Sequence, residues 1–476
     1  MRSKLIGIFL CVINFGFIDI LGAHPVDSTL KTLSVSEFIE VVKKYHPVAK
    51  QSQLIPEQAK AELLIARGGW DPTIYSTYDS KTYDGANYYS YFENKISVPV
   101  WYGIEISAGY DLVYGRNINN ESKLPKDGLG YLGISVPLLK NMLMDKQRAA
   151  LRKAQIFREA SEQQRLMILN DLLLDALKAY YNWSYAYNEY QIYKDATAVA
   201  VVRFNATVQS NLFGDRAAID TTEALTQLQN RQFQLNDARL LFLNSGVEIS
   251  NFLWLDNDQP RAFDTTIIPA PLNTEFTQPE IQLNKIDELA FQLRQTHPEL
   301  LNYNFKLRQL DIEGKLKIEN LKPTLNAKYN VLSERFNFQS NTGILFTNNY
   351  KFGLNFSMPL GFMQGRGALR LTKIEIQNTK YAIDFKQQEL TNKLKTYFNE
   401  LINLQQQTRL YQQTVAGYKT LFDGETTRFN NGESSLFLVN ARENRYLDSQ
   451  VKLRELQAKY FKTEAGLKWA VGNISK

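Results

Sequence analysis

Apolar residues recur at alternating steps of three and four positions over long stretches of this chain. In the C-terminal half the series comprises Leu390, Leu394, Tyr397, Leu401, Leu404, Tyr411, Val415, Tyr418 and Phe422, with Thr408 as its polar member. A similar series runs from Leu169 to Tyr190 in the first half. Sustained spacing of this kind predicts long helices that pack lengthwise, as in a coiled coil.

A second pattern precedes each long helical stretch. Apolar residues there alternate with small, polar or charged ones, which predicts β-strands. We expect one strand pair within residues 73–136 and another within residues 323–358. The first region is also rich in tyrosine, which is typical of an aromatic girdle at a membrane surface, or alternatively of packed loops. The clearest alternating runs are Ile104–Tyr114, Tyr131–Val136, Leu325–Val331 and Phe352–Met358.

The order of these patterns occurs twice. A His-Pro pair stands 25 residues before Pro72 in the first half and 25 residues before Pro323 in the second, counted from proline to proline. Both halves also carry a Ser-x-Pro-Leu sequence where the strands give way to the long helices, at Ser135 and at Ser357. The chain therefore predicts a duplicated unit of helix, strand pair, long helix, turn and long helix.

The expected boundaries follow from this repeat. Residues 24–256 form the first unit and residues 284–476 the second, joined by a proline-containing linker at residues 257–283. The first unit is divided into a helix at 33–66, strands at 73–136 and long helices at 138–254. The second is divided into a helix at 285–320, strands at 323–358 and long helices at 360–470.

The N-terminus predicts a signal peptide over residues 1–23. A short basic start is followed by a mostly apolar run, and Gly22-Ala23 offers small residues for cleavage. A membrane anchor is the alternative. The only cysteine, Cys11, lies in this segment, and lipidation there is disfavoured because Leu10 precedes it. A mature chain without cysteine excludes a disulfide scaffold and thiol chemistry.

Charge and candidate chemistry add little to this pattern. Removal of Arg2, Lys4 and Asp19 with the signal peptide lowers the net charge from +6 to +5, and no Lys/Arg block predicts nucleic-acid binding. The histidines, His24, His46 and His297, are too scattered for a metal or catalytic cluster. We therefore expect no enzyme, no cofactor and no metal site, and we interpret His46 and His297 as structural.

The strands cannot stand alone in a membrane. Two strand pairs give four strands, too few to close a barrel, and open strand edges are prohibitive in lipid because backbone groups would be unpaired. The strands must then pair with copies of the same chain, and three copies would give twelve strands. The long helices also need neighbouring copies to bury their seams.

In this layout the chain resembles the TolC-like family of outer membrane efflux and channel proteins. The resemblance implies a mainly α protein with a membrane β region, in which a trimeric 12-stranded β-barrel is continued by an α-helical coiled-coil tunnel in the periplasm. It also implies a homotrimer that contacts outer membrane lipid, a periplasmic adaptor protein and an inner-membrane RND or ABC transporter. The motifs that carry it are Ser135–Lys140 with Arg148–Arg152, Gly214–Asp220 with Glu223-Ala224, Pro359–Gly361, and Arg428–Gly432 with Ala441-Arg442.

The resemblance also implies candidate site residues at the two turns between long helices. Gly214 and Gly432, with Phe213 and Phe429, would form the periplasmic tip where the adaptor docks. The alternative for both glycines is an ordinary helix C-cap, in which glycine supplies a positive φ.

Asp220 and Arg428 are the candidates for the pore mouth. A ring of Asp220 side chains would favour cations, although an acid in the first turn of a helix is also explained by the helix dipole. The second turn lacks the acids common in the family, because Leu438 and Asn440 stand there. Arg428 either holds the tip closed against a neighbouring helix or is a plain surface arginine.

The predicted function is therefore an outer membrane channel, the passive export duct of a tripartite efflux or type I secretion system. The alternative is a non-channel periplasmic coiled-coil adaptor or structural protein.

Overall fold

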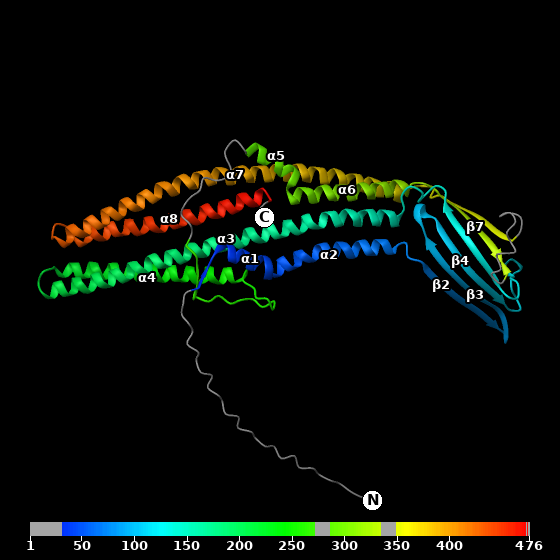
Figure 1. Ribbon diagram of the computed structural model, residues 1–476, viewed down its shortest axis with the longest axis horizontal. Coiled ribbons are helices and arrows are strands. Elements are labelled where there is room, and N and C mark those ends of the chain that lie inside the picture. The colour runs from blue at the N-terminus through cyan, green and yellow to red at the C-terminus, as the bar shows by residue number, and fades with distance from the viewer. Residues whose placement is uncertain (1–30, 272–285, 335–348, 473, 475–476) are drawn as a thin grey trace, which may run out of the picture.

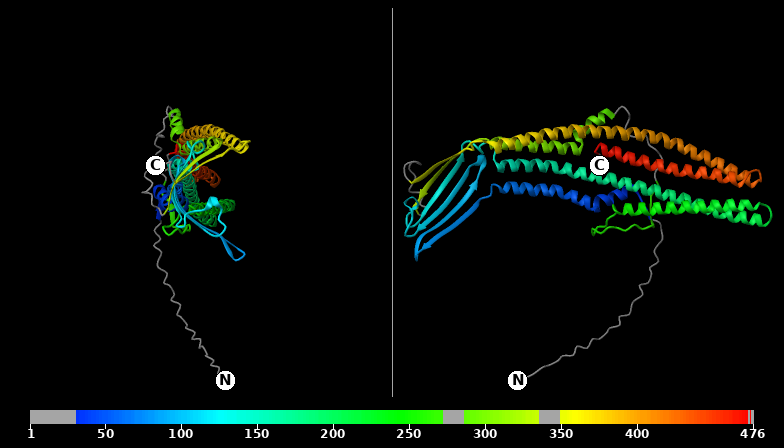
Figure 2. Two further views of the ribbon diagram at one scale, coloured as in Figure 1. Left: turned by 90° about the vertical axis from the view of Figure 1, so that its right-hand side faces the viewer. Right: turned by 180° about the vertical axis from the view of Figure 1, so that it is seen from behind.

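The protein is a long, curved rod of helices with a β-sheet at one end (Figures 1 and 2). The computed structural model describes residues 31–271, 286–334, 349–472 and 474. The expected signal peptide and residues 272–283 of the expected linker lie outside the described residues.

Eight helices in the described residues make up the rod, and they match in length between the two halves. The longest, α3 and α7, have 67 and 68 residues, which corresponds to about 100 Å at the rise of an α-helix. No described helix is both long enough and apolar enough to cross a membrane. The helices are α1 (Val35–Tyr45), α2 (Pro47–Gly68), α3 (Lys146–Leu212), α4 (Ala218–Ser250), α5 (Ile286–Thr296), α6 (Pro298–Glu319), α7 (Met363–Asn430) and α8 (Leu436–Ala470).

The single helices predicted at 33–66 and 285–320 are wrong in one respect, because each is two helices broken at a His-Pro pair. Proline lacks an N–H and disfavours the α conformation of the residue before it, and it suits the first position of a new helix. His46 accordingly has an extended backbone, with ψ 132°. The imidazole Nδ1 of His46 accepts a hydrogen bond from the Val48 N–H at 3.2 Å, and that of His297 accepts from the Glu299 N–H at 3.3 Å.

The prediction of one strand pair within residues 73–136 is also wrong, because this region forms two hairpins. The described sheet has six strands in the order β2-β3-β4-β5-β7-β8, and every neighbouring pair is antiparallel. The premise of four strands in each copy therefore fails, while the closed barrel and its total number of strands stay predictions. The strands are β2 (Thr73–Tyr83), β3 (Ala86–Pro99), β4 (Glu105–Tyr114), β5 (Leu129–Pro137), β7 (Thr324–Ser333) and β8 (Tyr350–Ser357).

The additional hairpin turns at Asp84-Gly85. Both residues have positive φ, 52° and 73°. Two consecutive positive φ values are the geometry of the type I′ turn, whose twist matches that of paired strands, and Asp-Gly is one of its preferred sequences.

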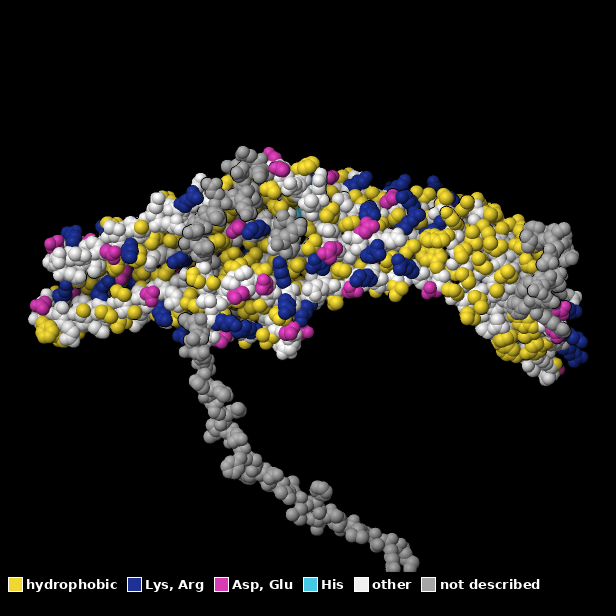
Figure 3. Space-filling view, viewed as in Figure 1, with side chains coloured by type: hydrophobic (Ala, Val, Ile, Leu, Met, Phe, Trp, Pro, Cys, Tyr) yellow, Lys and Arg dark blue, Asp and Glu magenta, His cyan; other side chains and the backbone are white. Residues whose placement is uncertain are grey.

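The two faces of the sheet differ in polarity. Residues paired directly across neighbouring strands share a face, so the pairing register defines rows across the sheet. One row is apolar at five of its six positions, and Figure 3 shows hydrophobic side chains gathered over the sheet. A neighbouring row on the opposite face is polar. The apolar-face row is Ile74, Ile96, Ala108, Leu132, Val331 and Tyr350, and the polar-face row is Thr73, Ser97, Ser107, Gly133, Asn330 and Lys351.

The helices form a wall that is one helix thick. Next to the sheet the helices lie side by side in the order α2-α3-α6-α7, and at the far end in the order α4-α3-α8-α7 (Figure 1). The two main hydrophobic clusters lie in the middle of the rod. One joins α1, α3 and α4 around Phe38, Tyr180 and Trp183, and the other joins α5, α7 and α8 around Leu394 and Phe398.

Part of the linker is bound to the rod at this level. The short strand β6 (Ile267–Pro269) pairs in parallel with β1 (Lys31–Leu33). The Tyr180 hydroxyl donates a hydrogen bond to the Leu33 carbonyl at 2.7 Å. The Phe263 ring packs against Phe242 and against Gly246, where a Cβ would stand 2.3 Å from the ring. Glycine at position 246 therefore makes room for the linker.

The buried His297 cap predicts a pH-dependent stability. Burial lowers the pKa of His297 from 6.5 to about 4, so the unfolded chain takes up the proton first as the pH falls. The neutral His297 cap contributes its full stabilisation above about pH 6.5. As the pH falls from there to about 4, the free energy of unfolding decreases by about 3 kcal/mol. Asn caps a helix without titrating. His297→Asn should therefore show a smaller loss of thermal midpoint between pH 7.5 and pH 5 by circular dichroism, and equal losses in both proteins would contradict the prediction.

Candidate functional site

The two turns at the far end of the rod have the same geometry. Gly214 has φ 80° and Gly432 has φ 79°. The N–H of the following residue bonds back five positions in both turns, from Asp215 to the Ser210 carbonyl at 2.9 Å and from Glu433 to the Arg428 carbonyl at 2.8 Å. These are Schellman caps, which require a left-handed residue after the helix. A Cβ on either glycine would meet no atom within 4 Å, so φ rather than space favours glycine.

The two turns also contact each other. The Arg216 guanidinium lies 4.0 Å from the centre of the Phe429 ring, a cation–π distance. Phe213 is 79% exposed. The structure thus brings the predicted tip residues of both repeats to one end of the rod, while adaptor docking by Gly214, Gly432, Phe213 and Phe429 stays a prediction.

Asp220 and Arg428 lie near this end but not together. Asp220 is half-buried in the first turn of α4. Arg428 is exposed, and its guanidinium lies 3.9 Å from the carboxylate of Glu425, one turn earlier in the same helix. Within the described residues, the ion pair of Arg428 is therefore local rather than between helices. The roles of both residues at a pore mouth remain predictions.

A buried charge cluster near the tip joins the two halves of the chain. Glu443 of α8 is 3% exposed, and its carboxylate accepts two hydrogen bonds from Arg203 of α3, at 2.8 and 3.0 Å. Arg231 of α4, itself 1% exposed, approaches the same carboxylate at 3.6 Å. Burial lowers the pKa of Arg231, and the negative charge of Glu443 opposes that effect.

Amide side chains complete this cluster. Asn440 accepts a hydrogen bond from Arg203 at 3.2 Å and donates one to Glu223 of α4 at 3.1 Å. Asn444 accepts a hydrogen bond from Gln227 at 3.0 Å. Asn440 therefore lies in the seam between the repeats.

Sequence reasoning missed this cluster, although a signal was present. Glu443 occupies a position of the 3–4 series of α8, between the buried residues Val439 and Leu447. A charged residue at a core position of a coiled coil predicts a buried partner. The partners themselves come from the other half of the chain, so spacing could not identify them.

A second buried arginine fixes the junction between the sheet and the long helix α3. Arg148 is 4% exposed. It bonds the Asp145 carboxylate at 2.7 Å and the Asn141 carbonyl at 2.6 Å, and it lies over the Tyr102 ring. The arginine therefore holds the segment through which β5 enters α3.

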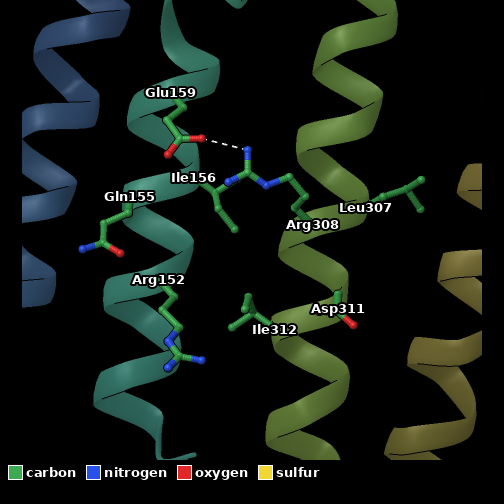
Figure 4. A pocket seen from close by; sticks show the side chains of 8 residues that line it. All are labelled: Arg152, Gln155, Ile156, Glu159, Leu307, Arg308, Asp311 and Ile312. Atoms are coloured by element: carbon green, nitrogen blue, oxygen red, sulfur yellow. Dashed lines mark hydrogen bonds and ion pairs between the residues drawn. The ribbon is translucent and has the colours of Figure 1, made fainter. Parts of the chain in front are cut away.

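An open groove lies along the seam between α3 and α6 (Figure 4). Its volume is about 490 Å³, and the ion pair of Arg308 with Glu159, at 2.7 Å, crosses it. No group of metal-ligating side chains occurs among the described residues. The groove is a partly filled seam between neighbouring wall helices, lined by Arg152, Gln155, Ile156, Glu159, Leu307, Arg308, Asp311 and Ile312.

Solved structures share this architecture over nearly the whole chain. The Campylobacter jejuni outer membrane channel CmeC is 15% identical, with a TM-score of 0.66, covering 92% of this chain and 86% of that one. The open Neisseria gonorrhoeae channel MtrE is 14% identical, with a TM-score of 0.68, covering 93% and 89%. The Vibrio cholerae outer membrane protein VceC is 12% identical, with a TM-score of 0.63, covering 92% and 96%. At these identities the likeness defines the fold, which is that of outer membrane channels.

Part of the sequence also matches a protein-family model. Residues 289–473 match the model of the outer membrane efflux protein family, and none of the curated proteins matches the chain significantly. This match covers most of the second repeat, and it agrees with the predicted resemblance to outer membrane efflux and channel proteins.

The charge cluster yields a stability prediction. Glu443→Gln would leave Arg203 and Arg231 buried around a neutral amide, and removing one member of a buried ion pair typically costs about 3–5 kcal/mol. We expect a loss of stability of that order in urea unfolding followed by circular dichroism. Glu433→Gln, at an exposed position of the second turn, is the matched control and should change little. Equal stability of the two variants would show that the cluster contributes nothing.

Proposed function

We propose that the chain is one subunit of a trimeric outer membrane channel, the exit duct of a tripartite efflux or type I secretion system. The observation that carries this proposal is the wall of single thickness, which leaves apolar side chains exposed on both of its edges. Next to the sheet these edges are α2 and α7. Their exposed apolar residues are Leu54, Leu64 and Ile65 on α2, and Leu371, Ile374, Tyr381 and Phe385 on α7.

The far end of the rod also exposes apolar side chains on both of its edge helices. There the edges are α4 and α7, with exposed Phe233, Leu240 and Val247 on α4 and exposed Leu410 and Leu421 on α7. Burial of such side chains stabilises an assembly by about 25 cal/mol per Å² of apolar surface. A neighbouring copy that presents the opposite edge supplies this burial, and repetition of one such contact closes a ring. Three copies are the number that the family resemblance implies.

In such a ring, the polar face of the sheet lines the passage and the apolar face meets outer membrane lipid. The polar face carries the ion pair of Lys95 with Glu105, at 2.6 Å, and the charged residue Lys351. A hydrated, charged wall suits the passage of water-soluble cargo. The duct is passive, and an inner-membrane RND or ABC transporter supplies the energy.

The tip is the proposed docking site for a periplasmic adaptor. Beside the matched turns at Gly214 and Gly432, the apolar side chains of Leu212, Phe213 and Phe437 are 72%, 79% and 66% exposed. Apolar side chains grouped at one exposed end are typical of a protein contact surface. A periplasmic adaptor or structural rod, the alternative class, does not account for a sheet with one apolar and one polar face.

The central test is assembly and conductance. Protein purified in detergent should migrate as a heat-labile trimer and should give single-channel conductance in planar lipid bilayers. A monomer without conductance would overturn the proposal.

Asp220 can be tested in the same bilayers. If its carboxylates line the pore mouth, Asp220→Asn should weaken block by a multivalent cation such as hexaamminecobalt(III) several-fold, because the electrostatic attraction of the mouth is reduced. Asp175→Asn, at an exposed position in the middle of α3, is the control and should leave the block unchanged. Block of unchanged strength in Asp220→Asn would remove this residue from the mouth.

A further inference from the structure

In the part of the chain that the structure describes, β2 and β8 are the first and last strands of the six-stranded sheet, and neither pairs with a further strand. All residues of β2 and all residues of β8 are exposed, whereas the four inner strands are mostly half-buried or buried. Unpaired backbone groups on a strand edge each cost several kcal/mol in a lipid environment. Both edges therefore require partner strands if the sheet lies in the membrane.

The directions of the two edge strands allow them to pair between neighbouring copies. All five neighbouring pairs in the sheet are antiparallel, so the first and the sixth strand run in opposite directions. β8 of one copy can then pair with β2 of the next copy in the same antiparallel manner as every other pair. An odd number of strands would instead have made this contact parallel.

The additional hairpin is part of the same wall. β3 and β4 pair without a register shift from Ser90–Tyr114 to Pro99–Glu105, and β2 pairs with β3 from Thr73–Ser97 onwards. The hairpin also shares one apolar row with the sheet, because Ile74 and Ile96 are paired in line with Ala108 and Leu132. Nothing in the pairing separates the hairpin from the four strands that follow it.

The width of the helical tunnel agrees with this larger sheet. Four wall helices in each copy give twelve in a trimer, and at about 9 Å between axes their circumference is about 110 Å. Strands about 4.8 Å apart and tilted by about 40° each cover about 6 Å of circumference. At that tilt, eighteen strands also span about 110 Å. A barrel of eighteen strands can therefore continue the tunnel without narrowing.

We propose that three copies close a barrel of eighteen strands, six from each chain, in which β8 of each copy pairs with β2 of the next. This inference rests on the proposed trimeric channel and deepens it. Barrels of sixteen to eighteen strands enclose a water-filled channel. The duct therefore takes larger hydrated cargo than a twelve-stranded barrel could pass.

Cysteine cross-linking tests which strand meets β8. Cys11 is the only cysteine in the sequence, so a Cys11→Ser background permits defined pairs. Asn355→Cys on the polar face of β8 is combined in turn with Tyr75→Cys, Thr77→Cys or Asp79→Cys on the same face of β2. Oxidation with copper phenanthroline should give covalent dimers and trimers in denaturing gels with at least one of these partners.

The matched control moves the partner to β4. Asn355→Cys with Ser107→Cys should give no cross-link between subunits, because β2 and β3 lie between these strands. Covalent trimers from the β4 pair would overturn the proposal and place the hairpin outside the barrel. Ser97→Cys with Ser107→Cys, a directly paired position of β3 and β4, should form a disulfide within one chain and verifies that the hairpin keeps its register.

A strand count by electron cryomicroscopy in lipid nanodiscs makes the result decisive. Eighteen strands are expected, and twelve strands in a conducting trimer would overturn this inference while leaving the proposed function intact. Absence of both trimer and conductance would instead overturn the proposed function itself.

Discussion

The structure depends on one constraint, which is that its walls are only one element thick. In an ordinary domain a helix or sheet buries its apolar face against a second layer. Here α2, α3, α6 and α7 lie side by side, and the sheet extends in one layer from β2 to β8. Side-by-side packing buries the seams between neighbours but leaves an edge at each end, which a further copy would cover in the proposed trimer. The exposed apolar residues of α2, α4 and α7 are the visible consequence.

Within one chain, the same constraint explains where the two repeats are joined. A wall without a second layer is held together only by its seams. The central seam, between α3 of the first repeat and α6 and α8 of the second, contains buried charges in addition to apolar contacts. The buried Glu443, Arg203 and Arg231 fix it near the tip, and the exposed ion pair of Arg308 with Glu159 spans it near the sheet. Buried charges that must meet their partners fix the register of long helices, which apolar ladders leave free to slide.

Particular residues show how far sequence reasoning reached. The 3–4 ladders predicted the long helices, and the glycines at 214 and 432 marked both turns, because a Schellman cap needs a residue with positive φ. The breaks before Pro47 and Pro298 were predictable from proline geometry and were missed because the flanking helical pattern continues across them. The hairpin at Asp84-Gly85 was missed because β3 mixes tyrosine, serine and asparagine on both faces, so its alternation is weak. Of the candidate site, the tip glycines were found, but the Glu443 cluster was not, since Glu443 lies more than 200 residues from both of its arginine partners.

The sequence by itself determined the duplicated order of elements, the two tips and the resemblance to outer membrane channels, because periodicity, turn residues and caps are local properties of the chain. Only the tertiary structure decided that the sheet has six strands, that Arg428 pairs within its own helix and that Asn440 lies in the seam between the repeats. These features depend on which strands and helices become neighbours. That choice is made by pairing and packing between segments far apart in the chain, and no local pattern encodes it.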